Sequence, residues 1–402
     1  MAGDGWQNVR LSDICRIIYR YPSFYGMEKS NQGVPVVRGE HLLGTGRISN
    51  DWSDYWFVTP EYSAKFPKTQ LEEHDIVMSV RGTVGQFARV GPEHVGAQIS
   101  PNTIRISPDP KKVFPPFLFQ VLRSESVIHF LQGTVATSAV PGLKACDIKQ
   151  TPLSLPPIVE QRSIALVLGA LDDKIELNRR MNATLEAFTQ TLFRKWFIDP
   201  AQSGLPECWR ESTIRDLASN IQYGLTQSAS TDPVGPRFLR ITDIQGGRID
   251  WGTVPFCKVS REEHDRYRLK SDDVLVARTG ASTGENIYLP VVPDAVFASY
   301  LVRFQFEDPA MARFVGAFMR TPAYFDFVAG SIGGSAQPNA SAQTLAGARV
   351  AVPPLRLLQK FAEAVGPLDR RIAENNKESR TLAELRDVLL PKLLAGEIRA
   401  RS

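Results

Sequence analysis

The sequence predicts an α+β protein made of two copies of one unit, in which a mixed, mostly antiparallel sheet domain is followed by a long helix. Three observations predict this class: an internal repeat, short β-type runs opening each copy, and a helical pattern closing it. A chain of 402 residues is longer than a single domain with one hydrophobic core usually is, so two or three domains are expected. Hydrophobic residues at 43% and charged residues at 22% are ordinary for globular proteins and exclude disordered or collagen-like classes.

The internal repeat is clearest where each domain meets its helix. Leu155-Pro156-Pro157 returns as Val352-Pro353-Pro354, an offset of 353 − 156 = 197 residues, and Leu171-Asp172 returns at the same offset as Leu368-Asp369. Earlier anchors match with small insertions, for example Gly46-Arg47-Ile48 with Gly247-Arg248-Ile249. Between the anchors the two copies differ, which suits two different ligands of one kind.

Short β-type runs, broken by Gly, Pro and Asn, open each copy. In the first copy they are Val34–Val37, Asp75–Ser79 and Thr103–Ile106, and Asp273–Leu275 matches Asp75–Val77 in the second. Runs of this length and composition predict the sheet part of each domain.

A long helix is predicted to close each copy. Pro156-Pro157 is a helix start signal, and the apolar residues that follow alternate by three and four, which is coiled-coil spacing. Gln161 to Phe197 is 37 residues, so the first helix would span roughly 55 Å. Such a helix needs a partner, and we expect the other copy's helix to pack against it in antiparallel orientation, with pseudo-twofold symmetry. The residues predicted to pair the helices are Leu168, Leu171, Ile175 and Asn178 in the first helix and Val365, Leu368, Ile372 and Asn375 in the second.

Asn178 and Asn375 occupy matched positions in this seam, where leucine would stabilise more. A buried polar pair can fix the register of two helices at a cost in stability. Alternatively, both amides point to water. The sequence leaves both interpretations open.

Together these features resemble the specificity subunits (HsdS) of type I restriction-modification systems. The resemblance covers essentially the whole chain and is carried by the two variable domains with their long helices, the L-P-P-x-x-x-Q segment at Leu155–Gln161, the Leu-Asp-x-x-Ile segment and the closing Leu389–Ile398. The second copy departs from the pattern, since Val352–Gln359 is one residue longer before its glutamine. No single motif is very specific, but the duplicated order of several is.

The resemblance implies a domain plan and a function. It implies target recognition domains at residues 1–155 and 201–352, a central spacer helix at 156–200 and a C-terminal spacer helix at 353–402. Each recognition domain would read one half of a split double-stranded DNA site, with half-sites about one helical turn, roughly 34 Å, apart. The helices would set the gap and dock two modification subunits (HsdM), and restriction subunits (HsdR) would join them. The partner subunits would carry out adenine methylation and would bind S-adenosylmethionine and ATP. This chain is therefore expected to be non-catalytic and to bind no cofactor.

A self-contained DNA methyltransferase is the main alternative. Its adenine-binding motif begins with Asn or Asp, whereas the nearest string here, Phe114-Pro-Pro-Phe117, begins with a residue that cannot accept a hydrogen bond and is expected to introduce a packed helix. Gly44-Thr-Gly46 lacks a third glycine, and Gly280–Gly284 is followed by Glu285 where a phosphate loop needs lysine. The five histidines form no close ligand pair, which gives a metallonuclease little support. A structural adaptor that does not bind DNA is the other alternative.

DNA-reading residues are expected in loops that follow matched strands, because base edges are read by donors and acceptors such as Arg, Asn and Gln. A net charge of only +4 means that any DNA contact is local and patterned. Arg38 and Arg240 either reach phosphates or pair with a local acid, and the loop residues either read bases or form a solvated tight turn. The DNA-binding candidates are Arg38, Arg81, Thr83, Gln86 and Lys144 in the first copy and Arg240, Arg278, Thr279, Ser282 and Thr283 in the second.

The remaining sequence features concern the compartment. The four cysteines, Cys15, Cys146, Cys208 and Cys257, lie far apart and are expected to be isolated reduced thiols. The first residues have no signal pattern, and no window approaches the roughly 18 apolar residues of a membrane span. A cytoplasmic protein that does not bind membranes is therefore expected.

Overall fold

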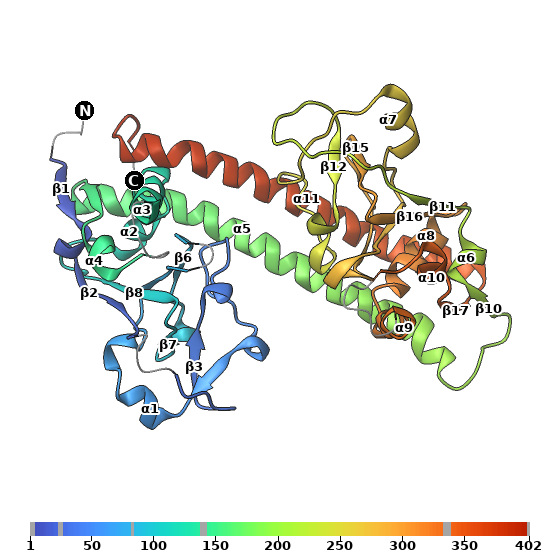
Figure 1. Ribbon diagram of the computed structural model, residues 1–402, viewed down its shortest axis with the longest axis horizontal. Helices are drawn as coiled ribbons and strands as arrows, with labels where there is room; N and C mark the ends of the chain where they lie inside the picture. The colour runs from blue at the N-terminus through green and yellow to red at the C-terminus, as the bar shows by residue number, and fades with distance from the viewer. Residues whose placement is uncertain (1–4, 23–26, 82–83, 137–142, 333–338, 400–402) are drawn as a thin grey trace. The chain divides into compact units, whose positions relative to one another are not determined.

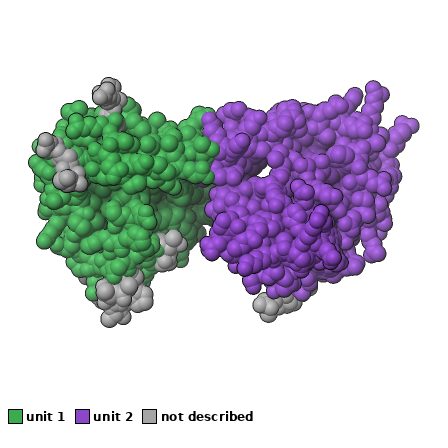
Figure 2. All heavy atoms as spheres, turned by 90° about the horizontal axis from the view of Figure 1, so that it is seen from above, with its two compact units in different colours: residues 1–177, 381–402 green, residues 178–380 purple. Residues whose placement is uncertain are grey.

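The computed structural model describes residues 5–22, 27–81, 84–136, 143–332 and 339–399 (Figure 1). The chain forms two compact units: residues 1–177 with 381–402, and residues 178–380 (Figure 2). Each unit therefore contains one sheet domain together with segments of both long helices.

The first unit contains two sheets and a two-stranded ribbon. Its strands are β1 (Gln7–Arg10), β2 (Cys15–Arg20), β3 (Val34–Val37), β4 (Trp56–Val58), β5 (Ile76–Ser79), β6 (Phe87–Arg89), β7 (Gln98–Ile99), β8 (Thr103–Pro108) and β9 (Pro152–Leu155), and its short helices are α1 (Pro60–Ala64), α2 (Pro115–Leu122), α3 (Glu125–Ala136) and α4 (Ala145–Lys149). The main sheet has the order β2-β8-β5-β6 and is antiparallel throughout, β4-β3-β7 includes the parallel pair β3–β7, and β1 pairs with β9.

The second unit repeats this topology. Its strands are β10 (Arg210–Thr213), β11 (Asn220–Tyr223), β12 (Arg237–Leu239), β13 (Val274–Ala277), β14 (Asn286–Tyr288), β15 (Ala295–Phe297), β16 (Leu301–Gln305) and β17 (Arg349–Val352), and its short helices are α6 (Ile214–Leu217), α7 (Arg261–Tyr267), α8 (Pro309–Phe318), α9 (Pro322–Ile332) and α10 (Ala342–Ala346). The order β11-β16-β13-β14 corresponds strand for strand to β2-β8-β5-β6, β12–β15 is the parallel pair, and β10 pairs with β17. The predicted duplication and the mixed, mostly antiparallel sheets are confirmed.

Each domain is followed by a long helix, as the sequence predicts. Helix α5 spans Ile158–Phe193 and α11 spans Leu355–Leu394, and their first residues are 355 − 158 = 197 apart, the offset of the repeat. The predicted end of the first helix at Phe197 differs in detail, because the last turn, Arg194–Ile198, is π-helical. At this turn Phe197 is buried with Phe193 against Phe314 and Phe361.

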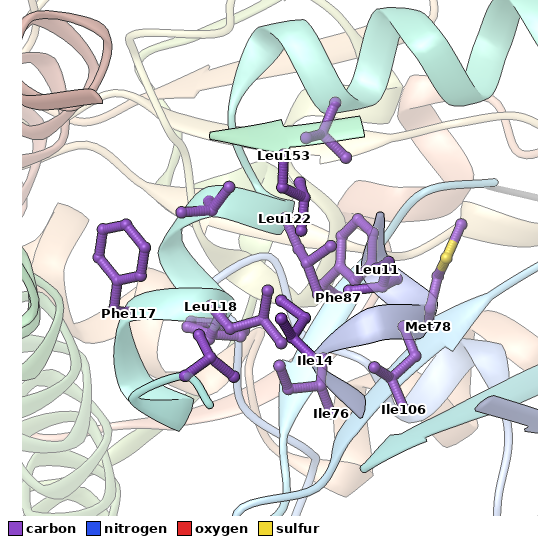
Figure 3. Packing of buried hydrophobic residues seen from close by; sticks show 14 of the residues in the cluster. Leu11, Ile14, Ile76, Met78, Phe87, Ile106, Phe117, Leu118, Leu122 and Leu153 are labelled. Atoms are coloured by element: carbon purple, nitrogen blue, oxygen red, sulfur yellow. The ribbon is translucent and has the colours of Figure 1, made fainter. Parts of the chain in front are cut away.

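The two cores show how the helices pair. In the first unit the sheet and α2 bury residues such as Ile76, Ile106 and Phe117 (Figure 3), and this cluster also contains Leu168 of α5 and Leu390 and Leu393 of α11. The beginning of α5 thus packs with the end of α11.

In the second unit the relation is reversed, since Phe193 and Phe197 from the end of α5 share a cluster with Phe361 and Val365 from the beginning of α11. The predicted antiparallel pairing is confirmed.

Other expectations can be read from the same elements. Phe114 is the N-cap of α2 and introduces a buried helix, as predicted in place of a methyltransferase motif. The four cysteines are unpaired thiols, with Cys257 buried and Cys146 and Cys208 exposed. Over the described residues, no helix combines the length and apolar character that a membrane span requires.

Candidate nucleic-acid interface

The matched strands β5 and β13 end in the loops that the sequence analysis singled out. All four residues of each strand are buried. In the first copy Val80 after the strand is buried as well, so the chain reaches the surface at Arg81, whereas in the second copy it reaches the surface at Arg278, directly after the strand. Glycines with positive φ then turn the chain back: Gly280 at +71° and Gly284 at +95° in the second copy. The two loops therefore occupy equivalent edges of equivalent sheets.

The second loop is a tight 3-10 turn, the alternative that the sequence analysis kept beside base reading. Thr279 is its N-cap residue, and the Thr283 hydroxyl donates to the Gly280 carbonyl at 2.7 Å. The Glu285 amide donates to the Ser282 carbonyl at 2.9 Å. Thr283 thus has an internal role, while Thr279 and Ser282 are half-exposed. A DNA contact by any of the three stays a prediction.

Arg278 lies in an ordered polar cluster at this edge. Its guanidinium carbon is 4.9 Å from the ring centroid of Tyr223, the last residue of β11, and its Nη2 donates to Asn339 Oδ1 at 3.2 Å. The Arg278 amide donates to the carbonyl of Tyr300, whose side chain is 55% exposed. Tyr223 is also exposed, and its hydroxyl accepts from the Ala342 amide at 2.8 Å. The sequence analysis did not identify Asn339. An antiparallel β-bridge between Asn339 and Thr279 brings Asn339 to Arg278, and no local sequence pattern predicts this bridge.

The first loop has different chemistry. Arg81 is exposed, and Thr83 lies outside the described residues. The Gln86 side chain points inward, and its Nε2 donates to the Leu42 carbonyl. The backbone amide of Gln86 donates to Ser79 Oγ at 3.1 Å. Beside Arg81, at the end of β2, burial and then the nearby Arg81 charge lower the pKa of Arg20, which donates to the Pro101 carbonyl at 3.0 Å. The described part of this edge is thus dominated by two arginines, and the Gln86 side chain holds the turn together.

Arg38 and Arg240 adopt the local-acid arrangement that the sequence allowed. Arg38 pairs with Glu40 and stacks on the Trp56 ring at 4.3 Å. Arg240 makes a bidentate pair with Asp243 at 3.0 and 2.9 Å, and these hydrogen bonds raise the pKa of Arg240. Phosphate contacts by either arginine remain predictions. Lys144, the last DNA-binding candidate, is an exposed N-cap residue whose amide donates to Asp147.

The seam of the paired helices is polar at its middle. Asn178 and Asn375 are 0% and 1% exposed, so the interpretation in which both amides point to water is wrong. Asn178 Nδ2 donates to Glu378 Oε2 at 2.8 Å, and Asn375 Nδ2 donates to Asn182 Oδ1 at 2.8 Å. Asn182 in turn donates to Asn376 Oδ1 at 2.7 Å. The register role of Asn178 and Asn375 stays a prediction, with Asn182 now added to the network.

The apolar pairing residues divide into two groups. Leu168 and Val365 are fully buried in the cores of the first and second unit. Leu171, Ile175, Leu368 and Ile372 are only half-buried. The contact between the two helices is therefore less deeply buried along its length than the coiled-coil spacing predicts.

The aspartate of each Leu-Asp pair fastens a domain to its helix, a role that sequence reasoning missed although the repeat marked both residues. Asp172, 6% exposed, accepts from Gln120 Nε2 at 2.8 Å, Arg123 Nη1 at 3.0 Å and Arg386 Nη1 at 2.9 Å. It thereby links α2, α5 and α11 within the first unit.

Asp369 makes the corresponding link in the second unit, where Arg313 donates to it twice, at 2.7 and 3.0 Å. Burial raises the pKa of the Asp369 carboxyl, and the Arg313 guanidinium acts in the opposite direction.

The Gly-Arg-Ile anchors of the repeat form a second fastening. Arg47 contacts Asp173 of α5 at 2.6 Å in the first unit, and Arg248 contacts Glu186 of α5 at 2.6 Å in the second. Each arginine follows a glycine with positive φ, at +80° for Gly46 and +68° for Gly247. A Cβ at Gly46 would also collide with the Phe119 ring, whereas one at Gly247 would meet only the mobile end of the Arg320 side chain, so the positive φ is the main reason for glycine there.

Within the described ranges, no three His, Cys, Asp or Glu side chains gather as metal ligands. The polar clusters described above are arginine-rich edges at the ends of the main sheets and ion pairs that join each domain to its long helices.

Comparisons with known proteins agree on one family. The profile described as "Type I restriction modification DNA specificity domain" matches residues 3–187. The HindI specificity subunit of Haemophilus influenzae is 22% identical over 98% of this chain and 99% of its own length. The EcoKI specificity subunit of Escherichia coli K12 is 21% identical over 99% of this chain and 90% of its own. The crystal structure of a type I S subunit from M. genitalium matches with a TM-score of 0.56 at 15% identity, over 97% of this chain and 96% of that one, and so supports the fold.

Proposed function

We propose that this chain is a specificity subunit of a type I restriction-modification system, which recognises a DNA sequence in two halves and positions its partners there. The observation that carries this function is the pair of sheets with one strand order and different residues at the same edge: Arg20 and Arg81 in one copy, Tyr223 and Arg278 in the other. One frame carrying two divergent surfaces suits two different half-sites of one kind of polymer.

The helices supply the constant gap between the half-sites. At 36 and 40 residues, α5 and α11 would be roughly 54 and 60 Å long, which exceeds the roughly 34 Å between half-sites one turn apart. The fastenings at Asp172 and Asp369 tie each domain to its helix, and the antiparallel contacts tie the helices together. The added helix length leaves room for partner subunits.

Helix α5 offers a surface for the modification subunits. Val159, Leu166, Leu177 and Phe188 are each at least half exposed. Their spacings of 7, 11 and 11 residues return to one face of an α-helix within about 20° each time. Exposed apolar side chains in one row along a helix are available to a partner protein, and we assign this row to the modification subunits.

A pair of variants tests this assignment. Leu166→Glu and Phe188→Glu are expected to reduce co-purification of the modification subunit, because each buries a charge in the contact. Val291→Glu is the matched control, since Val291 is 53% exposed but lies between β14 and β15. Equal losses in all three variants would contradict docking on α5.

Genome-wide mapping of methylated adenines is the direct experiment on the function. Cells carrying this chain and its modification subunit should methylate a split motif with a constant gap. Methylation by the purified chain alone with S-adenosylmethionine would support the self-contained methyltransferase in its place. Absence of specific DNA binding together with intact subunit assembly would support the structural adaptor.

Arg81 provides a test of which domain reads which half. We expect Arg81→Ala to weaken discrimination at the first half-site by about 1 to 3 kcal/mol and to leave the second intact, if Arg81 contacts a base. An equal loss on all DNA sequences would assign Arg81 to a phosphate.

Chemistry and location follow from this division of labour. The modification subunits would hold S-adenosylmethionine, ATP would act with the restriction subunits, and this chain would bind neither. Its place would be the cytoplasm, where the target DNA lies.

A further inference from the structure

We propose that Tyr223 and Asn339 hold the Arg278 guanidinium as a preset guanine reader, and that Tyr300 lies beside it on the base-reading surface of the second domain. This inference rests on the proposed function and names the residues and the base class for one half-site.

The geometry fixes the Arg278 side chain on two sides. Tyr223 stacks on the guanidinium at 4.9 Å, which restrains its plane, and the bond from Nη2 to Asn339 Oδ1 at 3.2 Å restrains its rotation within that plane. The supports are themselves anchored: the Tyr223 hydroxyl accepts from the Ala342 amide, and Asn339 bridges to Thr279. A long flexible side chain is thus ordered before any ligand arrives, which lowers the entropic cost of binding.

The remaining donors point to guanine. Nε of Arg278 is buried and has no hydrogen-bond partner within the described part of the chain, so the terminal nitrogens are the ones that a ligand can reach. A guanidinium carries five N–H donors, and only one is used by Asn339. Two parallel donors on the terminal nitrogens match the O6 and N7 acceptors of guanine in the major groove, the commonest specific arginine contact with DNA.

The exposed aromatic residues fit the same use. Tyr223 and Tyr300 are 39% and 55% exposed, and both lie where strands of the main sheet end or begin, next to Arg278. By contrast, Tyr324 of the same domain is 0% exposed. In the first copy the position matching Tyr223 is Arg20, which has no ring to stack on Arg81. The two edges therefore read different bases.

The experiment uses the full chain in complex with its modification subunit. Duplexes would carry the mapped target with single base changes in the second half-site, and methylation rates would give the base preference at each position. For the unaltered complex we expect a guanine preference at one position. Tyr223→Leu and Asn339→Ala should each reduce that preference about tenfold, and the first half-site should keep its specificity.

Two controls separate positioning from folding. Tyr223→Phe keeps the ring that stacks on Arg278 and removes only the hydroxyl that accepts from Ala342, so it should retain more of the preference than Tyr223→Leu. Asn220→Ala changes an exposed amide at the other end of β11, where Asn220 pairs with Gln305, and should change no base preference. Asn339 is exposed, so Asn339→Ala should leave the fold intact. This variant keeps the test informative even where Tyr223→Leu lowers the stability of the domain.

The outcomes are distinct. The inference is overturned by an unchanged guanine preference in Tyr223→Leu and Asn339→Ala, by a loss spread evenly over both half-sites, or by a preferred base other than guanine at the affected position. If the unaltered complex methylates no split motif at all, the proposed function itself fails.

Discussion

Replacing Asp172 by Ala should destabilise the first unit by about 3 to 5 kcal/mol, because it removes one partner of a buried ion cluster. The carboxylate accepts three hydrogen bonds, two of them from guanidinium groups whose side chains are 14% and 17% exposed. Without it, Arg123 loses its ion-pair partner, and Arg386 keeps only its pair with Asp387, whose side chain is 65% exposed. Burial lowers the pKa of Arg123, and the nearby Arg386 charge lowers it further, so the two guanidinium groups already repel each other.

The neighbouring aspartate provides a matched control. Asp173 also binds an arginine, Arg47 at 2.6 Å, but the two side chains are 62% and 36% exposed. Exposed ion pairs contribute about 0 to 1 kcal/mol, so Asp173→Ala should have a small effect. The two variants differ by one position on one helix and remove the same charge.

Hydrogen exchange measured segment by segment is the suitable assay, because a chain of two compact units need not unfold in one step. In Asp172→Ala, protection should fall in α2 and in the beginning of α5, while peptides from residues 210–352 keep theirs. The reasoning would be refuted by a loss below about 1 kcal/mol, or by an equal loss in Asp173→Ala.

Three further predictions address other features. Replacing Asn178 and Asn375 together by Leu should loosen the register of the helices, so that the methylated motif tolerates more than one gap length; an unchanged single gap and oligomeric state would remove the register role. Gly46→Ala should cost at least about 1 to 3 kcal/mol in thermal unfolding, since φ is +80° and the new methyl meets a buried ring, and a wild-type melting temperature would contradict this. Burial raises the pKa of the Cys257 thiol to about 11, so only about one thiol in a thousand is ionised at pH 8. A disulfide reagent should therefore label exposed Cys208 and spare Cys257 until the chain unfolds or the pH approaches that pKa. Rapid labelling of Cys257 in the native protein would argue against its burial.

Much of the architecture could be predicted because it follows from local patterns in the sequence. The offset of 197 residues, the buried β-type runs and Pro156-Pro157 before a helix are each visible in a short stretch of sequence. The Leu-Asp pairs were also visible, but an aspartate in an apolar pattern does not show which arginines surround it. Arg123 and Arg386 approach Asp172 from positions 49 and 214 residues away.

The candidate site could be predicted only in part for the same reason. The loops after β5 and β13 were located from strand endings, so Arg81 and Arg278 are where expected. Asn339 was not found, because it meets Arg278 across 61 residues. Gln86 has the side chain of a base reader, yet its amide holds a backbone carbonyl, and the choice between these uses depends on tertiary contacts.

The division of the chain into units has a consequence for its synthesis on the ribosome. Residues 381–402 belong to the same compact unit as residues 1–177, and Leu390 and Leu393 lie in its core. The core of the domain made first is therefore complete only after the last segment has been translated, whereas residues 178–380 form an uninterrupted stretch. A stop codon after Arg380 would thus damage the early half of the product more than the late half.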